Sequence, residues 1–383
     1  MRIDKEGFAR LQLSLLAEPG DPRLVRLLED STAEELVAAL TSGHRKDVPP
    51  NWTARAHTLV GQAALVLERA AGRGLRWISV ADKTWPAGLG DLDHVEPING
   101  ATGAPLGLWI RGPADLAELC NHSVAIVGAR DATTYGCDVA SDLAADLADN
   151  GITVVSGAAF GIDVCAHRGA ISMGKPTIAV LAGGADVHYP RAHTSLIERI
   201  ATDSMVVSEQ LPGQAPIKSR FLSRNRLIAA MTGGTVVVEA ARRSGALNTL
   251  NWADQLGRVT MGVPGPVTSH ASVGVHQALR SGKAIVVTNG REVLEALGVL
   301  GAIDATPDRA PESAYDRLPG LARRIIDALP WGVVRSAAEI GAEVGMPISD
   351  VDDHLASLER IRLVNREACG WSLQRRADLL REG

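Results

Sequence analysis

The chain has 383 residues, of which 46% are hydrophobic and 22% are charged, and its formal net charge at pH 7 is −5. This length exceeds that of one ordinary domain and this composition supports a sizeable core, so we expect two or three folded domains. We expect neither an integral membrane protein nor a standard exported one, because no apolar run is long enough and no signal pattern is recognisable. The four cysteines are widely spaced and form no zinc-ligand pattern, which favours a reducing cytoplasm and neither a metal nor a cofactor.

Residues 1–105 have the periodicity of amphipathic helices. Leucines recur at three- and four-residue spacings, namely Leu24, Leu27, Leu28, Leu36 and Leu40. Asp21 stands before a proline and Ser31 stands shortly before an acidic pair, and both arrangements are helix start signals. We therefore expect a helical N-terminal domain that ends near residue 105.

Residues 106–298 alternate between apolar, β-branched runs and segments of helical spacing. The apolar runs lie at 123–127, 152–155, 177–181, 205–208, 235–238, 259–263 and 284–287. Near-continuous apolar strands that alternate with helices are typical of a parallel sheet covered on both faces. The predicted fold class is therefore α/β, with a parallel sheet at its centre.

The segments that follow these strands are rich in glycine, serine and charge. They include Gly128, Arg130, Ser156, Gly157, Gly161, Ser244 and Gly245. In a parallel sheet, ligands bind beyond the carboxyl ends of the strands, where glycine lets backbone N–H groups approach an anion. Each loop alone could be a capped turn, but their convergence on one sheet edge favours a site for a nucleotide or a polyanion.

A basic segment accompanies these loops. Between Gln210 and Val238 there are four basic residues and no acidic one, although the whole chain is negatively charged. The segment contains Lys218, Arg220, Phe221, Arg224, Asn225 and Arg226. This composition is typical of a helix N-terminus that holds phosphates beside a ring on which a base can stack. A solvated helix face is the alternative interpretation.

Several fingerprints of common enzymes are absent from the sequence. There is no Gly-x-x-x-x-Gly-Lys-Ser/Thr phosphate loop, no Gly-x-Gly-x-x-Gly after the first strand and no Gly-x-Ser-x-Gly elbow. We therefore expect no catalytic residues. We interpret Asp163 and Glu239 as structural carboxylates that hold arginines in place by charge-assisted hydrogen bonds.

The order of these motifs resembles that of the DNA-processing protein A family, also called DprA or Smf. The motifs are Ile-Val-Gly-Ala-Arg at 126–130, Val-Ser-Gly at 155–157, Gly-Ile-Asp at 161–163, Arg-Asn-Arg at 224–226 and Val-Pro-Gly at 263–265. The resemblance extends over roughly residues 20–375. Three positions depart from the family pattern. Ala129 replaces the usual serine, His276 replaces the usual asparagine, and Lys283 stands where alanine is common.

The resemblance implies a domain plan. It consists of a sterile-alpha-motif or helix-hairpin-helix domain over 1–105, an extended Rossmann-like core over 106–298, a linker over 299–319 and a winged-helix domain over 320–375. The third helix expected in the last domain carries Asp350, Asp352 and Asp353, which favours protein interaction or weak DNA binding over strong duplex binding.

The resemblance also implies a function. Members of the family bind single-stranded DNA, form homodimers and load the RecA recombinase during natural transformation. The DNA contacts expected here come from Gly128, Arg130, Ser156, Gly157, Gly161, Lys218, Phe221, Arg224, Asn225, Arg226, Ser244 and Gly245. The expected dimer interface lies in the helix that carries His276, Ala278 and Leu279.

Two other functions remain open at this point. One is a phosphoribohydrolase of the "lonely guy" type, whose Gly-Gly-x-Gly-Thr-x-x-Glu motif is only partly matched by residues 233–239. The other is a regulatory module that binds mononucleotides.

Overall fold

The computed structural model describes residues 3–45, 47–298, 315 and 317–374, so most of the expected linker over 299–319 lies outside the described residues. The chain divides into two compact units, Met1–Ile303 and Asp304–Gly383, and each is described by itself. Within the described ranges, no helix combines the length and hydropathy that crossing a bilayer requires.

The first unit begins with five helices. They are α1 (Lys5–Ser14), α2 (Pro22–Glu29), α3 (Ala33–Thr41), α4 (Pro50–Ala56) and α5 (Leu59–Ala71). Asp21 caps α2 as its sequence predicts, whereas α3 is capped by Thr32, one residue after the expected Ser31, in a reciprocal capping box with Glu35. Leu24, Leu27, Leu36 and Leu40 from the predicted periodic positions are buried in the core of this helical layer.

The centre of the unit is a nine-stranded sheet in the order β1-β2-β6-β5-β4-β3-β7-β8-β9. The strands are β1 (Arg76–Ile78), β2 (Leu108–Arg111), β3 (Ser123–Val127), β4 (Thr153–Ser156), β5 (Thr177–Leu181), β6 (Met205–Ser208), β7 (Gly234–Val237), β8 (Val259–Gly262) and β9 (Ile285–Val286). All neighbouring pairs from β6 to β9 are parallel, whereas β1 and β2 add an antiparallel edge. The α/β fold class is confirmed, and the sheet begins at Arg76, well before residue 106.

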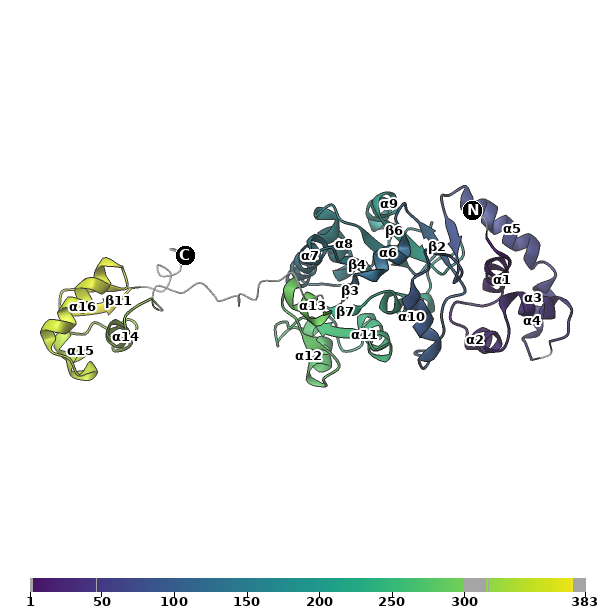
Figure 1. Ribbon diagram of the computed structural model, residues 1–383. Coiled ribbons are helices and arrows are strands. Elements are labelled where there is room, and N and C mark those ends of the chain that lie inside the picture. The colour runs from purple at the N-terminus through teal and green to yellow at the C-terminus, as the bar shows by residue number, and fades with distance from the viewer. Residues whose placement is uncertain (1–2, 46, 299–314, 316, 375–383) are drawn as a thin grey trace. The chain divides into compact units, whose positions relative to one another are not determined.

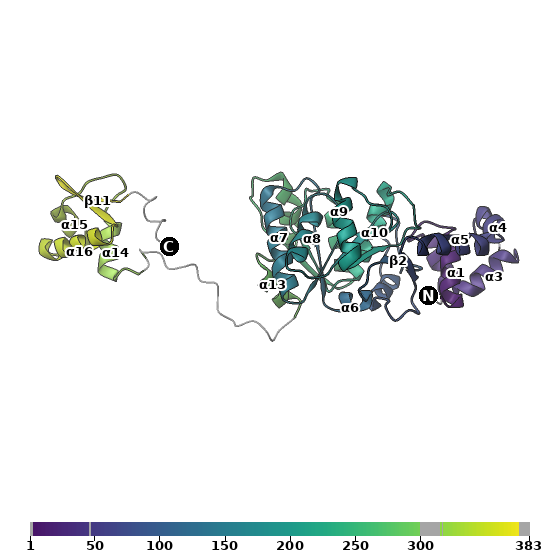
Figure 2. The same ribbon diagram turned by 90° about the horizontal axis from the view of Figure 1, so that it is seen from above.

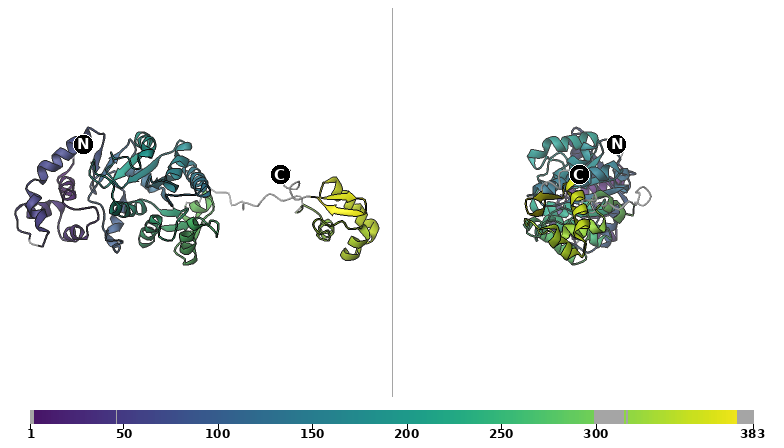
Figure 3. Two further views of the ribbon diagram at one scale, coloured as in Figure 1. Left: turned by 180° about the vertical axis from the view of Figure 1, so that it is seen from behind. Right: turned by 90° about the vertical axis from the view of Figure 1, so that its left-hand side faces the viewer.

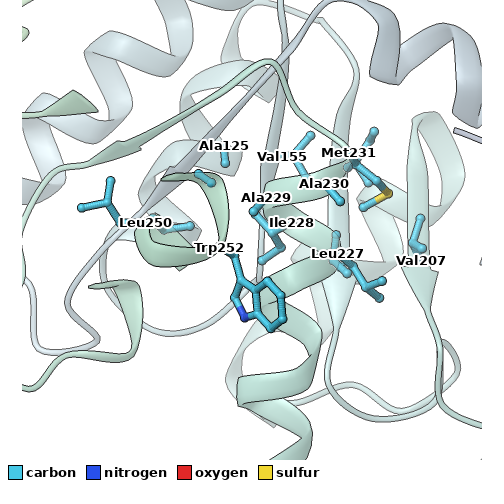
Figure 4. Packing of buried hydrophobic residues seen from close by; sticks show 14 of the residues in the cluster. Ala125, Val155, Val207, Leu227, Ile228, Ala229, Ala230, Met231, Leu250 and Trp252 are labelled. Carbon is cyan, nitrogen blue, oxygen red and sulfur yellow. The ribbon is translucent and has the colours of Figure 1, made fainter. Parts of the chain in front are cut away.

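Helices cover both faces of this sheet (Figure 1). They are α6 (Leu116–Asn121), α7 (Thr134–Asp149), α8 (Ile162–Ser172), α9 (Thr194–Asp203), α10 (Lys218–Ala230), α11 (Gly245–Gln255), α12 (Val273–Arg280) and α13 (Gly290–Ala296). Successive side chains of a strand point to opposite faces. On β3, Val124 and Ile126 pack in one cluster with α7, α8 and α13, whereas Ala125 and Val127 pack in another with α10 and α11. Figure 4 shows part of the second cluster, in which Leu227 and Ile228 of α10 lie near Trp252 of α11.

The N-terminal helices lie at the β2 end of the unit, far from α12 and α13, as the views in Figures 2 and 3 agree. Cross-contacts hold them to the core, since the Trp77 indole donates to the Gly7 carbonyl at 3.1 Å and Arg220 of α10 forms an ion pair with Glu18. The carboxyl ends of β3, β4 and β7 therefore remain uncovered by this helical layer, and the candidate site lies there.

The described residues of the second unit form three helices and a hairpin. The elements are α14 (Gly320–Asp327), α15 (Ala337–Val344), α16 (Ile348–Arg360), β10 (Val364–Glu367) and β11 (Gly370–Leu373). Its core contains Ile325, Ile340, Leu355 and Trp371. Arg335 pairs with Trp371 and so adds a third short segment to the hairpin.

Candidate nucleic-acid interface

A groove with a volume of about 960 Å³ lies at the carboxyl ends of β3 and β7, beside the N-terminal turns of α10 and α11. Its walls come from the loop after β3 (127–131), from α10 and from the segment 241–251. These segments are far apart in sequence and meet because β3 and β7 are parallel neighbours. The predicted convergence of the loops on one sheet edge is therefore present in the fold.

The groove is lined mainly by cations. The exposed lining residues include four cations, Arg130, Lys218, Arg242 and Arg243, and the buried Arg224 lies at the floor. Among its lining residues only Asp131 and the buried Asp163 are acidic. The groove thus has a positive excess in a chain whose net charge is −5.

Sequence reasoning missed Arg242 and Arg243. The signal was available, because the two arginines directly precede Ser244, which belongs to one of the predicted strand-end loops. Ser244 caps α11, since its hydroxyl accepts from the Ala246 N–H at 3.3 Å. The cap places the preceding arginines at the rim of the groove.

Phe221 forms an aromatic wall of the groove. Its ring is partly exposed, and the Arg130 guanidinium lies over it with Cζ 4.6 Å from the ring centroid. The Tyr189 ring also packs near it, with ring centroids 5.7 Å apart and ring planes inclined by 59°. Lys218 and Phe221 are one helical turn apart on α10, so a cation and a ring lie side by side at the start of this helix.

Arg224 is part of the floor rather than a free cation. Its guanidinium donates to the carbonyl of Gly157 at 2.8 Å and to that of Val180, and its Nε donates to Asn225 Oδ1 at 3.2 Å. Burial lowers the pKa of Arg224 to about 10, and Asp163 opposes this effect. A Cβ at Gly157 would lie 2.2 Å from a guanidinium nitrogen of Arg224, so the buried position of Arg224 leaves no room for a side chain there.

The two structural carboxylates hold loops. Asp163 accepts from the N–H groups of Gly157 at 3.1 Å and Ala159 at 3.3 Å, and burial raises its pKa although Arg224 opposes this shift. Glu239 accepts from the Thr133 N–H at 2.9 Å and from the Thr133 hydroxyl at 2.6 Å. Glu239 therefore fixes the loop after β3, and the expectation that it holds an arginine is wrong.

Arg226 contradicts the prediction of a phosphate contact. Its side chain is fully buried, and both terminal nitrogens donate at 2.7 Å to the two carboxylate oxygens of Glu209. Its remaining donors reach the carbonyls of Gly103 and Ser223. The physical reason is that Arg226 is turned toward the segment that follows β6, where Glu209 supplies a buried partner.

Of the other residues predicted to contact DNA, some line the groove and others are buried in the fold beneath it or lie outside its lining. Gly128 and Gly245 line the groove, and Asn225 also lines it while its amide donates to the Gly245 carbonyl and to Asn248 at 3.2 Å each. Ser156 is fully buried and its hydroxyl donates to the Ile126 carbonyl at 2.7 Å, which contradicts a DNA contact by that hydroxyl. Gly161 has φ of +74° and starts α8 outside the lining of the groove.

The site offers little to a metal ion. Across the described ranges, no group of three or more His, Cys, Asp or Glu side chains is placed to hold one. The histidine below the floor, His167, is fully buried with its Nδ1 2.8 Å from the Thr177 hydroxyl, and burial lowers its pKa to about 3. His167 is therefore neutral at physiological pH and adds no positive charge to the groove.

Comparisons with known proteins identify the family. The chain matches the sequence profile described as DNA recombination-mediator protein A over residues 76–298. It is 40% identical over 378 residues to the putative DNA processing protein DprA of Mycobacterium tuberculosis H37Rv, covering 97% of this chain and 96% of that protein. It is 32% identical over 287 residues to the protein Smf of Escherichia coli, covering 72% of this chain and 74% of that protein. The chain belongs to the DNA recombination-mediator protein A family.

Solved structures agree with this assignment. The X-ray structure of DprA from Streptococcus pneumoniae superposes with a TM-score of 0.62 at 29% identity, covering 77% of this chain and 98% of that one. A structure of DprA from Helicobacter pylori, described by its unique single-stranded DNA binding mode, superposes with a TM-score of 0.50 at 26% identity, covering 58% and 96%. The family resemblance found in the sequence is therefore confirmed.

Proposed function

We propose that this chain binds single-stranded DNA along the groove and mediates recombination without catalysing a reaction. The observation that carries the proposal is the set of four exposed cations, Arg130, Lys218, Arg242 and Arg243, around the partly exposed ring of Phe221. Cations that follow a backbone and a ring that accepts any base form the pattern of sequence-independent single-strand binding. The Helicobacter pylori relative, described as a single-stranded DNA binder, supports the same ligand.

The salt dependence of binding tests this proposal. Each phosphate neutralised on a single strand contributes about 0.7 to the slope of log affinity against log salt, so four cations contribute about 2.8. We expect a labelled oligothymidylate to bind the full chain with a slope near that value, measured by fluorescence anisotropy. A slope near zero, or preferential binding of mononucleotides, would overturn the proposal.

The absence of turnover is a second part of the proposal. The carboxylates near the groove, Asp163 and Glu239, accept hydrogen bonds from backbone and threonine donors of the protein itself. Both side chains are also buried, so neither carboxylate is placed to take a proton from a substrate. We expect no base release when nucleoside monophosphates are incubated with the protein, and chromatography would detect a glycosidase if one were present.

We further propose that the protein acts as a homodimer that delivers the strand to the RecA recombinase. The expected interface at Leu279 needs revision, because that side chain packs toward β8 against Gly262. A better candidate is the edge strand β9, where Ile285 and Val286 are 51% and 54% exposed and β8 is the only partner among the described residues. Exposed apolar edge strands pair readily with a second copy.

The dimer is tested by light scattering coupled to size exclusion. Ile285→Lys should give a folded monomer that retains the salt slope but no longer accelerates RecA ATPase on a strand coated with single-strand-binding protein. Leu279→Glu should instead lower the melting temperature, since its side chain packs inside the unit. A dimeric Ile285→Lys protein would place the interface elsewhere.

For the second unit we propose a winged helix. Three helices followed by the β10–β11 hairpin, with Arg335 paired to Trp371, match that order of elements. Its third helix, α16, exposes Asp350, Asp352 and Asp353, which would repel a phosphate backbone. We therefore assign this unit to protein contacts rather than to DNA.

A further inference from the structure

Half of the chain's phenylalanines and tyrosines gather at one place beside the groove. The chain has three of each, and Phe160, Tyr189 and Phe221 all line one small cavity, together with Arg130. Phe160 and Tyr189 are 48% and 47% exposed. Aromatic rings usually bury a large apolar area, so two half-exposed rings beside a partly exposed third indicate a surface that has a ligand.

The Phe160 ring is held in position from below. The buried His193 packs edge-to-face against it, with centroids 4.7 Å apart. The His193 Nδ1 lies 3.0 Å from the Ala158 carbonyl oxygen, which can only accept, so this nitrogen carries the proton. Ala158 itself has φ of +52°, in the left-handed region that alanine rarely adopts. A strained residue and a buried histidine together fix the loop that presents Phe160.

The space between the rings is too small to enclose a base. The cavity has a volume of about 30 Å³, and Gly157, Ala159 and Gly183 are among its lining residues. No acidic residue lines it. The cavity therefore leaves only the outer faces of the rings for a nucleobase, and its lining has no carboxylate that would repel the flanking phosphates.

We propose that Phe160, together with Tyr189, is a second stacking platform that takes the nucleobase next to the one on Phe221, and that His193 is its positioning residue. This inference rests on the proposed binding of single-stranded DNA. It extends the site from the cationic groove across the loop after β4, so the strand runs from Arg242 and Arg243 past Phe221 toward Phe160.

The test compares an oligothymidylate with an abasic strand of the same length, which keeps the phosphates and lacks the bases. Phe160→Ala in the full chain should weaken binding of the oligothymidylate about tenfold and leave the abasic strand unchanged. The salt slope should not change, because the ring carries no charge. Phe160→Trp should restore the affinity. Met173→Ala, at an exposed residue that lines neither the groove nor the small cavity, should change neither strand.

His193→Gln tests the positioning role. It should cause a base-dependent loss like that of Phe160→Ala, and the double variant should lose no more than Phe160→Ala alone, because both act through one ring. If Phe160→Ala binds the oligothymidylate as tightly as wild type does, and the abasic strand likewise, the inference is overturned and the proposed function stands. A wild-type protein that binds neither strand would overturn both. A loss on both strands with a lower melting temperature would mean that Phe160 only supports the fold.

Discussion

Two helices of thirteen residues, α10 in the first unit and α16 in the second, have opposite charge and opposite burial. Helix α10 carries four basic residues and no acidic one, yet Arg224 and Arg226 are buried and Arg220 is paired with Glu18. Helix α16 carries four acidic residues, and all of them are exposed. Only Lys218 of α10 is both basic and exposed.

The difference teaches that charge along a sequence is not charge on a surface. An arginine can be buried when its guanidinium N–H groups donate to carbonyls, as for Arg224, or to a carboxylate, as for Arg226. The positive field of the groove then depends on cations in the flanking loops, Arg130, Arg242 and Arg243. In α16 the buried positions are apolar, so its carboxylates remain in water.

The largest expected effect comes from removing the buried cation Arg226. Arg226→Ala leaves Glu209 buried without its partner, and breaking a buried ion pair costs about 3–5 kcal/mol. We expect urea unfolding to show a loss of that size, with the salt slope of DNA binding unchanged in the protein that remains folded.

The matched control is Arg199→Ala, which removes an exposed ion pair with Asp203 on α9. Exposed pairs contribute about 0–1 kcal/mol, so this variant should be close to wild type in stability. An Arg226→Ala protein with wild-type stability and a flatter salt slope would show that Arg226 contacts a DNA phosphate after all.

The buried side chain of His167 predicts that the free energy of unfolding depends on pH. Burial, and secondarily Arg224 and His193, lowers the pKa of His167 from 6.5 to about 3. The folded state therefore favours neutral His167, and the stability that this contributes is complete above pH 6.5 and is lost as the pH falls toward 3. One proton taken up on unfolding changes stability by about 1.4 kcal/mol per pH unit.

His167→Gln should make the plot of unfolding free energy against pH less steep between pH 6.5 and pH 3, because one fewer proton is taken up on unfolding. Asn150→Gln, at an exposed residue that does not titrate, serves as the control and should leave that slope unchanged. An identical slope in wild type and His167→Gln would mean that His167 becomes protonated within the folded state.

Much of the fold was predictable from the sequence. The seven apolar runs correspond to β3 to β9. For β3 to β7 the reason is burial on both faces, which requires apolar residues throughout a strand, whereas β9 is an exposed edge strand. The pairing of β1 with β2 was not predictable, since the three residues of β1 carry no pattern that identifies a partner. The order of the strands likewise depends on contacts between segments that are distant in sequence.

The candidate site was predictable in part. Lys218, Phe221 and Asn225 line the groove and follow the spacing of one helix face, which could have separated them from Arg226, about 100° further round the helix. Burial of Arg226 depends on Glu209, which lies on a different element and could not be assigned as its partner beforehand. Arg242 and Arg243 were not predicted, because the serine and glycine that define the loop motif come after them.

Removing the exposed cations Arg242 and Arg243 should weaken DNA binding without lowering the stability of the fold. The double variant Arg242→Ala, Arg243→Ala should flatten the salt slope by about 0.7 for each phosphate that it no longer neutralises, and should weaken binding of all sequences alike. Its melting temperature should match that of wild type, because both side chains are exposed. Arg199→Ala, an exposed arginine outside the groove, should keep the wild-type slope, and an unchanged slope in the double variant would remove both residues from the site.

The smallest expected effect concerns α16. If the second unit held DNA through this helix, as many winged helices do, Asp350, Asp352 and Asp353 would oppose every phosphate brought near them. Their replacement by asparagine would then raise affinity and steepen the salt slope. We expect neither change for single-stranded or duplex DNA, because the exposed acidic face fits a protein partner better than a polyanion. Anisotropy titrations of the triple variant at low salt, where surface charges are least screened, are the most sensitive measurement. A marked gain in affinity there would show that α16 faces the DNA and that its carboxylates restrain binding.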